Sequence, residues 1–388
     1  MSTMTKTSEQ LLYLMACALQ GVSAREEVLA DADLKQLLIM ARKHSVASMV
    51  CMALEKTAIF ANADEATKKQ WIDAKNKAIR KNMLLDAERK IISHELETQG
   101  IWYMPLKGSI LKDWYPKPGM REMADNDILF DASKRKEVKA IFQGRGYTVK
   151  GYNKSNHDEY EKPPIYNFEM HVELYHKIYD TFNEKYADVK QRLIPDAEVP
   201  YRFHFTPEDF YAFVIAHAYK HYSGSGTGIR TLADIYIMNQ KLGGTMNWEY
   251  VDSELRGMGI FSYERESREL AQKLFGIAEL PTKANLSETE QQMLAYYLGA
   301  STYGTIENRT LNKMRKLQPD GGAITAHTKR KYLLSRIFPG REWCEAYAPT
   351  VYKYPVLLPF FWVWRLAVKG VKRRDIAKQE LEAIKRER

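Results

Sequence analysis

Two carboxylates with potential for metal chemistry, Asp125 and Asp127, stand one residue apart in "REMADNDILFD" (121–131), directly before an apolar run. Side chains two residues apart on a strand share a face. Bare carboxylates at ~4–6 Å repel and raise one another's pKa, and a divalent cation removes that repulsion. Oxygen ligands of this kind suit Mg²⁺ or Mn²⁺. The chain contains 49 Asp and Glu residues, and an ordinary acidic turn can have the same spacing. This pair alone therefore does not distinguish a metal site from an acidic turn.

A second feature, "PLKGS" (105–109), precedes the aspartates. Its pattern predicts a strand that runs into a Gly-Ser turn and then a helix. Such a turn directs backbone N–H groups and the positive end of the helix toward a phosphate. An arginine four residues before Asp125 suits a phosphate oxygen at the same place. The predicted nucleotide-phosphate ligands are Lys107, Gly108, Ser109 and Arg121.

A third feature is the segment "YNFEMHVELYHKI" (166–178), which alternates between apolar and polar residues with period two and predicts a strand. We take Glu173, on its polar face, as the third carboxylate. His171 lies on the same face. Its predicted role is left open between a ligand, a proton shuttle and a hydrogen-bonded residue of the sheet.

Further polar residues follow in "HAYKHYSGSGTGIRTLADIYIM" (217–238). His217 and His221 are one helical turn apart and can meet a common ligand. We do not favour zinc, because no third ligand stands at a suitable spacing. The alternatives are contacts to a base or an acceptor and interhelical packing that includes an Arg230–Asp234 pair. The candidates for a base or acceptor contact are His171, His217, Lys220, His221, Arg230 and Asp234.

The elements that must position these residues divide the chain into three segments. Residues 1–99 read as helices, of which the last is long, charged and ended by Gly100. Residues 100–200 alternate short apolar strands with amphipathic helices, and residues 201–388 are helical again. We therefore predict an α+β fold, in which a small mixed sheet is flanked by N-terminal and C-terminal helical regions.

One segment of the sequence resembles the motif of a known family. "LKGSILKDWYPKPGMREMADNDILF" is similar to the LKG-x(n)-YP-x-PG-x-R-x-x-x-D-h-D-h-h-h signature of the bacterial uncharacterised nucleotidyltransferases. That family belongs to the DNA polymerase beta-type superfamily. "VELYHKI" resembles the family's V-[DE]-L-H-W-x-h segment, and the helical segment 217–238 resembles its H-x-x-x-H motif. The sequence departs from the pattern at Asn126, where the family has an apolar residue, and at Tyr175, where it has histidine.

The resemblance implies a polymerase beta-like core and transfer of a nucleoside monophosphate from an NTP, such as ATP, to a hydroxyl or phosphate. It further implies that Asp125, Asp127 and Glu173 act in catalysis and hold two Mg²⁺ or Mn²⁺ ions. The acceptor class is a small molecule, a sugar or a protein side chain. Two alternatives stay open: a metal-dependent glycosyltransferase that uses a nucleotide sugar, and a degenerate nucleotide-binding protein without activity.

The charge of the chain is concentrated at its C-terminal end. The formal net charge is +9, and residues 365–388 contain nine Lys or Arg against four Asp or Glu. A long nucleic acid is therefore a less favoured acceptor than a small molecule. The apolar run 354–370 is too short to span a bilayer. We interpret it as a packing helix, or with the rest of 354–388 as a contact to a membrane surface.

The cysteines and the N-terminal residues bear on the cellular compartment in which we expect the protein. The three cysteines, Cys17, Cys51 and Cys344, are far apart in the sequence and follow no metal-ligand spacing, which favours reduced thiols. The first ten residues are polar and do not resemble a secretory signal. We therefore expect a cytoplasmic protein.

Overall fold

The structure is a computed structural model that describes residues 4–176, 179–281, 283–318, 322–372 and 374–387. The chain forms two compact units. The first consists of residues 1–218 and 228–302, and the second of residues 219–227 and 303–388. The segment boundaries after residues 99 and 200 follow changes in element type, and they remain a prediction about domains.

The first unit begins with helices, as predicted. Its longest helix, α6, starts after Asp64, whose side chain accepts a hydrogen bond from the Thr67 amide and so satisfies a free N–H group of the first turn. It ends before Gly100, which has a φ of 65°. The N-terminal helices are α1 (Lys6–Gln20), α2 (Glu26–Leu29), α3 (Leu34–Lys43), α4 (Ala47–Leu54), α5 (Ala58–Ala61) and α6 (Glu65–Thr98).

A five-stranded sheet follows, in the order β1-β2-β5-β4-β3. The pair formed by β2 and β5 is parallel, and the other neighbouring strands are antiparallel. The short edge strand β3 pairs with β4, with Thr148 opposite Glu161 and Val149 opposite Tyr160. The strands are β1 (Tyr103–Pro105), β2 (Asn126–Phe130), β3 (Thr148–Val149), β4 (His157–Lys162) and β5 (Tyr166–His171).

The strand predicted over 166–178 is shorter in the structure, because β5 ends at His171. The amides of Val172 and Glu173 both donate to the carbonyl oxygen of Asn156, at 2.9 and 3.3 Å. The backbone leaves the ladder at this point. The alternation of apolar and polar residues therefore continues past the end of the strand.

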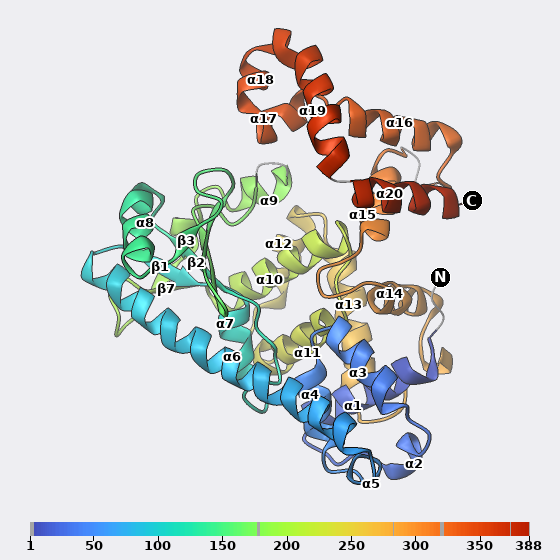
Figure 1. Ribbon diagram of the computed structural model, residues 1–388. Coiled ribbons are helices and arrows are strands. Elements are labelled where there is room, and N and C mark those ends of the chain that lie inside the picture. The colour runs from blue at the N-terminus through green and yellow to red at the C-terminus, as the bar shows by residue number, and fades with distance from the viewer. Residues whose placement is uncertain (1–3, 177–178, 282, 319–321, 373, 388) are drawn as a thin grey trace. The chain divides into compact units, whose positions relative to one another are not determined.

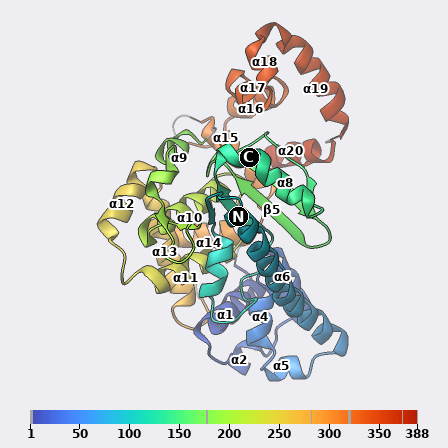
Figure 2. The ribbon, with the colours of Figure 1, turned by 90° about the vertical axis from the view of Figure 1, so that its left-hand side faces the viewer.

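One face of the sheet is packed and the other carries polar side chains. Helices α6 and α8 (Arg135–Gly144) cover the packed face (Figure 1, Figure 2). Alternate residues of the strands point to opposite faces, so Asp127 and Glu169 lie on the other side. The core of the packed face contains Ile92, Leu96, Tyr103, Ile128, Phe130, Val138, Ile141, Phe142, Tyr160, Phe168 and Met170.

Helices complete both units, which confirms the predicted α+β fold with a small mixed sheet and flanking helical regions. None of the helices in the described part of the chain combines the length and hydropathy needed to cross a membrane.

The first unit adds a short ribbon, β6 (Ile194–Pro195) and β7 (Phe203–His204). The remaining helices of the first unit are α7 (Gly108–Leu111), α9 (Asp180–Lys185), α10 (Pro207–Tyr222, whose last residues belong to the second unit), α11 (Arg230–Leu242), α12 (Trp248–Gly257), α13 (Phe261–Phe275) and α14 (Glu288–Gly299). Those of the second unit are α15 (Ile306–Lys316), α16 (Ala326–Ile337), α17 (Arg341–Tyr347), α18 (Pro349–Lys353), α19 (Leu358–Lys372) and α20 (Arg374–Arg386).

Candidate active site

The parallel pairing of β2 and β5 brings carboxylates from distant parts of the chain together. Asp127 of β2 is directly opposite Glu169 of β5. Asp125 immediately precedes β2, two residues before Asp127, and therefore belongs to the same side of the strand. The structure thus assembles three carboxylates at the polar face of the sheet, of which the sequence predicted two.

The three carboxylates perturb one another. Burial and then the charge of Asp127 raise the pKa of Asp125 above its ordinary value. Burial, with the charges of both aspartates, raises the pKa of Glu169 to about 8. Burial acts in the same direction on Asp127, but the Lys107 ammonium and a hydrogen bond with His171 outweigh it and hold the pKa of Asp127 below its ordinary value. Asp127 is therefore the most strongly stabilised anion of the three.

Lys107 lies beside Asp127 and links it to a distant helix. Its Nζ atom is 3.2 Å from Asp127 Oδ1 and 3.0 Å from Nε2 of His217 on α10. Lys107 has a φ of 41°, which residues other than glycine rarely adopt, and stands at the turn between β1 and α7. The structure therefore brings two predicted residues, Lys107 and His217, to the aspartates.

Gly108 and Ser109 form the turn that follows. A Cβ atom at Gly108 would lie 2.7 Å from Nη1 of Arg121, so the close approach of this arginine requires glycine. The Ser109 hydroxyl donates to the Leu106 carbonyl oxygen at 2.9 Å and is buried. The turn adjoins the site through the Leu106 amide, which donates to the Asp127 carbonyl oxygen at 3.0 Å. Phosphate binding by Gly108 and Ser109 stays a prediction.

Arg121 lies in a buried ion pair. Its guanidinium is buried and donates to both carboxylate oxygens of Asp234 on α11, from Nε at 2.7 Å and from Nη2 at 3.0 Å. The Tyr115 hydroxyl donates to the same carboxylate at 2.7 Å. Arg121 thus forms a buried ion pair with Asp234, and its contact to a phosphate stays a prediction. Arg230 donates from Nη1 to the Glu122 carbonyl oxygen at 2.8 Å. The Arg230–Asp234 pair stays a prediction.

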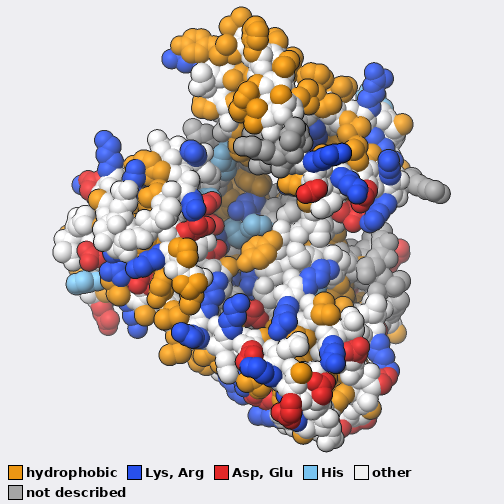
Figure 3. Space-filling model, viewed as in Figure 1, with side chains coloured by type: hydrophobic (Ala, Val, Ile, Leu, Met, Phe, Trp, Pro, Cys, Tyr) orange, Lys and Arg blue, Asp and Glu red, His pale blue; other side chains and the backbone are white. Residues whose placement is uncertain are grey.

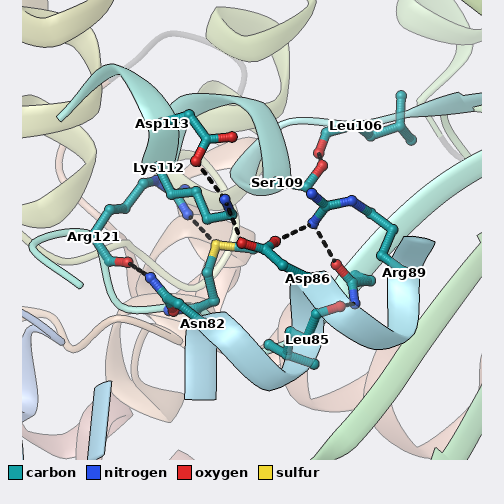
Figure 4. Close-up of polar contacts among 11 residues, drawn as sticks. Asn82, Leu85, Asp86, Arg89, Leu106, Ser109, Lys112, Asp113 and Arg121 are labelled. Carbon is teal, nitrogen blue, oxygen red and sulfur yellow. Dashed lines mark hydrogen bonds and ion pairs between the residues drawn. The ribbon is translucent and has the colours of Figure 1, made fainter. Parts of the chain in front are cut away.

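Polar side chains of α6 contact the segment that follows the Gly-Ser turn and the start of β2, as Figure 4 shows. Asn126 is fully buried. Its amide nitrogen donates to the Leu85 carbonyl oxygen at 3.0 Å, and its amide oxygen accepts from Arg89 at 3.2 Å. Asp86 pairs with Arg89 at 2.7 Å and with Lys112 at 2.8 Å. The polar residue at 126, which departs from the family pattern, thus anchors the start of β2 to α6.

The third carboxylate beside the aspartates is Glu169 and not Glu173. Glu173 lies two residues beyond the end of β5 and is exposed. The segment "FEMHVEL" (168–174) matches the family pattern V-[DE]-L-H-W-x-h in part: it has Glu169 at the acidic position and keeps the histidine, whereas Phe168, Met170 and Val172 replace the Val, Leu and Trp. That match was the sequence signal for Glu169. Tyr175 is then no substitute for a histidine. It is buried in an aromatic cluster, and its hydroxyl donates to the Phe213 carbonyl oxygen at 3.1 Å.

Three further basic residues lie on helices: Lys220 and His221 on α10, and Lys81 on α6. Lys220 and His221 belong to the last turn of α10, within the residues grouped with the second unit. Lys81 of α6 was not predicted. It donates to the Ala124 carbonyl oxygen at 2.8 Å, and its charge, with those of Lys107 and Arg230, opposes the rise in the pKa of Asp125 that burial causes. No local pattern distinguishes Lys81 from the other lysines of this helix.

His171 is a hydrogen-bonded residue of the sheet, in agreement with one of its three predicted roles. Its Nε2 atom lies 2.9 Å from Asp127 Oδ1 and 3.7 Å from Glu169 Oε2. Burial lowers the pKa of His171 to about 4, against the opposing effect of the Asp127 carboxylate, so its imidazole is neutral at pH 7. A neutral imidazole orients Asp127 without adding charge.

Comparisons with known proteins agree with this geometry. A family model described as "Uncharacterised nucleotidyltransferase" matches residues 30–276, which is more than half of the chain and includes the whole five-stranded sheet. Searches of curated proteins and of solved structures gave no significant match. The matched region spans the carboxylates of β2 and β5 and the helices that position them. The chain therefore belongs to a family of uncharacterised nucleotidyltransferases.

Proposed function

We propose that this chain is a Mg²⁺- or Mn²⁺-dependent enzyme that transfers a nucleoside monophosphate from an NTP to a hydroxyl or phosphate acceptor. The observation that supports it best is the opposition of Asp127 and Glu169 across β2 and β5, with Asp125 beside them. These three side chains would act in catalysis. The family to which the chain belongs points to the same reaction class.

The donor set fits divalent cations. Three carboxylates supply hard oxygen ligands, and the raised pKa values of Asp125 and Glu169 reflect repulsion and burial that a cation would relieve. Lys107 Nζ, 3.2 Å from Asp127, supplies one positive charge in this structure. Asp125, Asp127 and Glu169 would hold two ions. When bound, these ions would neutralise phosphate charge and favour ionisation of the acceptor hydroxyl.

The protein's own side chains have separable roles in this reaction. Lys81, Lys107 and Arg230 create positive potential at Asp125 and would attract the triphosphate. Glu169, whose pKa is raised, would accept the proton of the acceptor hydroxyl. His171 orients Asp127 through its hydrogen bond. Gly108 and Ser109, the first two residues of α7, would approach the phosphates.

The acceptor that we favour is a small molecule, a sugar or a protein side chain. A long nucleic acid needs an extended basic surface. The positive charge of this chain is concentrated in residues 365–388, whereas the family match ends at residue 276. His217 is a candidate contact for the base or the acceptor, because its imidazole lies 3.0 Å from Lys107 Nζ.

The experiment that tests the reaction is transfer of label from α-³²P-labelled NTPs, in the presence of Mg²⁺ or Mn²⁺, to small-molecule, sugar and protein acceptors. We expect the wild-type chain to transfer label and D125N/D127N to lose at least ~10³-fold of the rate, since both metal-ligand charges are removed. The matched control is D73N, which alters an exposed aspartate of α6 that pairs with Lys69. Equal labelling by wild type and D125N/D127N would contradict the proposal.

Titration with nucleotide sugars separates this proposal from the glycosyltransferase alternative. We expect Mg²⁺-dependent binding of NTPs that D125N/D127N abolishes. Tight binding of UDP-sugars, with none of NTPs, would instead favour a glycosyltransferase. Binding of NTPs with no transfer to any acceptor would favour a nucleotide-binding protein without activity.

We also propose that the second unit contacts a membrane surface through an apolar stripe. The stripe consists of Phe360, Val363 and Trp364, whose spacing places them on one face of α19, and of Val356, which lies just before that helix. Between 51% and 76% of each side chain is exposed. Figure 3 shows hydrophobic side chains gathered over α17, α18 and α19. Basic residues follow in the sequence, of which Arg373 and Arg388 lie outside the described residues.

Co-sedimentation with anionic liposomes tests this contact. We expect the wild-type chain to bind and F360S/W364S to bind at least ~10-fold more weakly, because burial of each aromatic side chain contributes up to ~3 kcal/mol. The control is L381S, at an exposed leucine of α20 outside the stripe. Equal sedimentation of wild type and F360S/W364S would contradict the contact.

A further inference from the structure

A second group of possible ligands lies beside the aspartates on the polar face of the sheet. His157 of β4 is directly opposite His171 of β5, and Glu169 is two residues before His171 on the same face. One possible ligand atom from each of these three residues lies within 4.8 Å of the other two. The group stands on two paired strands rather than on loops, so its geometry is fixed by the sheet.

The distances within the group are those of separate ligands and not of hydrogen-bonded partners. Nε2 of His157 is 3.8 Å and Nε2 of His171 is 3.7 Å from the same Oε2 atom of Glu169. Both distances exceed a hydrogen bond. Nitrogen and oxygen ligands ~2.0–2.2 Å from one zinc ion in tetrahedral geometry are ~3.3–3.6 Å apart. A closure of a few tenths of an ångström would therefore bring each nitrogen to such a distance from Glu169, and the two imidazoles offer ligand atoms within 4.8 Å of one another.

The environment of His171 supports a ligand role in addition to its place in the sheet. Its side chain is 6% exposed. Its Nδ1 atom is buried and has no hydrogen-bond partner among the residues that the structure describes. The nitrogen that faces Glu169 is Nε2, so His171 would bind an ion through Nε2 and carry its ring proton on Nδ1. Asp127 Oδ1, 2.9 Å from Nε2 of this imidazole, adds a further oxygen at the same place.

The group is accessible to an ion. The side chains of His157 and Glu169 are 21% and 28% exposed, so an entry path exists beside the buried His171. Glu159 lies on the same face, with Oε1 3.5 Å from Nε2 of His157, and adds negative charge. Two imidazoles and a carboxylate form a set typical of transition metals, whereas Mg²⁺ prefers oxygen ligands.

We propose that His157, Glu169 and His171 form a site for a divalent transition-metal ion of the Zn²⁺ class, which shares Glu169 with the carboxylate site for Mg²⁺ and differs from it by its two imidazole ligands. The ion would be held by the three side chains, with Asp127 as a further oxygen donor. The site does not depend on the proposed nucleotidyl transfer, since metal binding is measured without nucleotide.

Metal binding by the untagged full-length chain, after treatment with EDTA and gel filtration, tests the site. We expect one equivalent of Zn²⁺ by titration calorimetry, and a visible absorption band with Co²⁺ that reports nitrogen ligation. H157A and H157Q should each weaken Zn²⁺ binding at least ~10-fold. H94A, at an exposed histidine of α6, should bind Zn²⁺ as the wild type does. Far-UV circular dichroism of each variant establishes that it is folded.

Two further measurements separate the sites. D125N should retain Zn²⁺ binding within about threefold while it weakens Mg²⁺-dependent NTP binding. A chain that transfers no nucleotide but binds Zn²⁺ through His157 would refute the proposed function and leave this site standing. Zn²⁺ binding that is absent, or equal in wild type and both His157 variants, would overturn the site. Mg²⁺ that competes with Zn²⁺ at equal concentration would overturn it as well.

Discussion

The side-chain amide of Asn126 donates to the carbonyl oxygen of Leu85, and this contact fastens the start of β2 to α6. Asn126 stands between Asp125 and Asp127 and is fully buried. The residue at which the chain departs from the family pattern is therefore a structural anchor of the carboxylates. A polar group in this position is stable because both ends of its amide are hydrogen-bonded.

Replacement of Asn126 by the apolar isostere leucine removes both hydrogen bonds. We expect N126L to lower the free energy of unfolding by ~1–3 kcal/mol, because it leaves Arg89 with one partner fewer in a buried place. Urea unfolding followed by circular dichroism measures the change. N76L, at an exposed asparagine of the same helix, is the control and should change little. Equal stability of the two variants would show that the anchor contributes nothing.

Removal of the Arg121 guanidinium leaves Asp234 as a buried charge without its bidentate partner. We expect R121M to lower the free energy of unfolding by ~3–5 kcal/mol, and R121M/D234L to be more stable than R121M. R80M, at an exposed arginine of α6, is the control for urea unfolding. A variant R121M that is as stable as the wild type but binds NTP weakly would support the predicted phosphate contact.

We expect Lys107 to have opposite effects on the binding of cations and of nucleotides. In K107M the ammonium 3.2 Å from Asp127 is lost. We expect Mn²⁺ to bind at least ~10-fold more tightly without nucleotide, since a unit charge at ~4 Å is worth several kcal/mol at an effective dielectric constant of ~20. NTP binding should weaken. Calorimetric titrations measure both, and K117M, at an exposed lysine, is the control. A loss of both affinities would show that Lys107 supports the site only structurally.

The pKa of Glu169, raised from its ordinary value of 4.5 to about 8, predicts how stability depends on pH. Between these pH values the folded state binds more protons at this group than the unfolded state. Its contribution is therefore fully present below about pH 4.5 and is lost as pH rises to about 8. His171, whose lowered pKa is about 4, acts in the opposite direction between pH 4 and 6.5, because the unfolded state then binds the proton.

The comparison of E169Q with wild type isolates the glutamate. In EDTA, we expect the wild type to lose stability relative to E169Q as pH rises from about 4.5 to 8. Urea midpoints across this range measure the difference. E184Q, at a glutamate of α9, is the control. A difference between E169Q and wild type that stays constant with pH would contradict the raised pKa.

The choice between Glu169 and Glu173 shows where local pattern stops being informative. Both residues have the same parity in an alternating segment, so both fit the polar face of one strand. The structure separates them because β5 ends at His171 and because the register with β2 puts Asp127 opposite Glu169. The register depends on which residues of two distant strands pair with each other. The alternation of apolar and polar residues within one strand carries no information about that pairing.

The sequence by itself determined the α+β fold, the long helix α6, the position of β2 and the carboxylate pair at its start. These features depend on neighbours within a few residues: hydrophobic period, capping and the Gly-Ser turn. Tertiary structure alone decided the partner of Arg121, which is 113 residues away, the anchoring of Asn126 and the meeting of His157 with His171. Such pairs form because buried polar groups must find partners wherever the fold brings them, and sequence separation gives no measure of that distance.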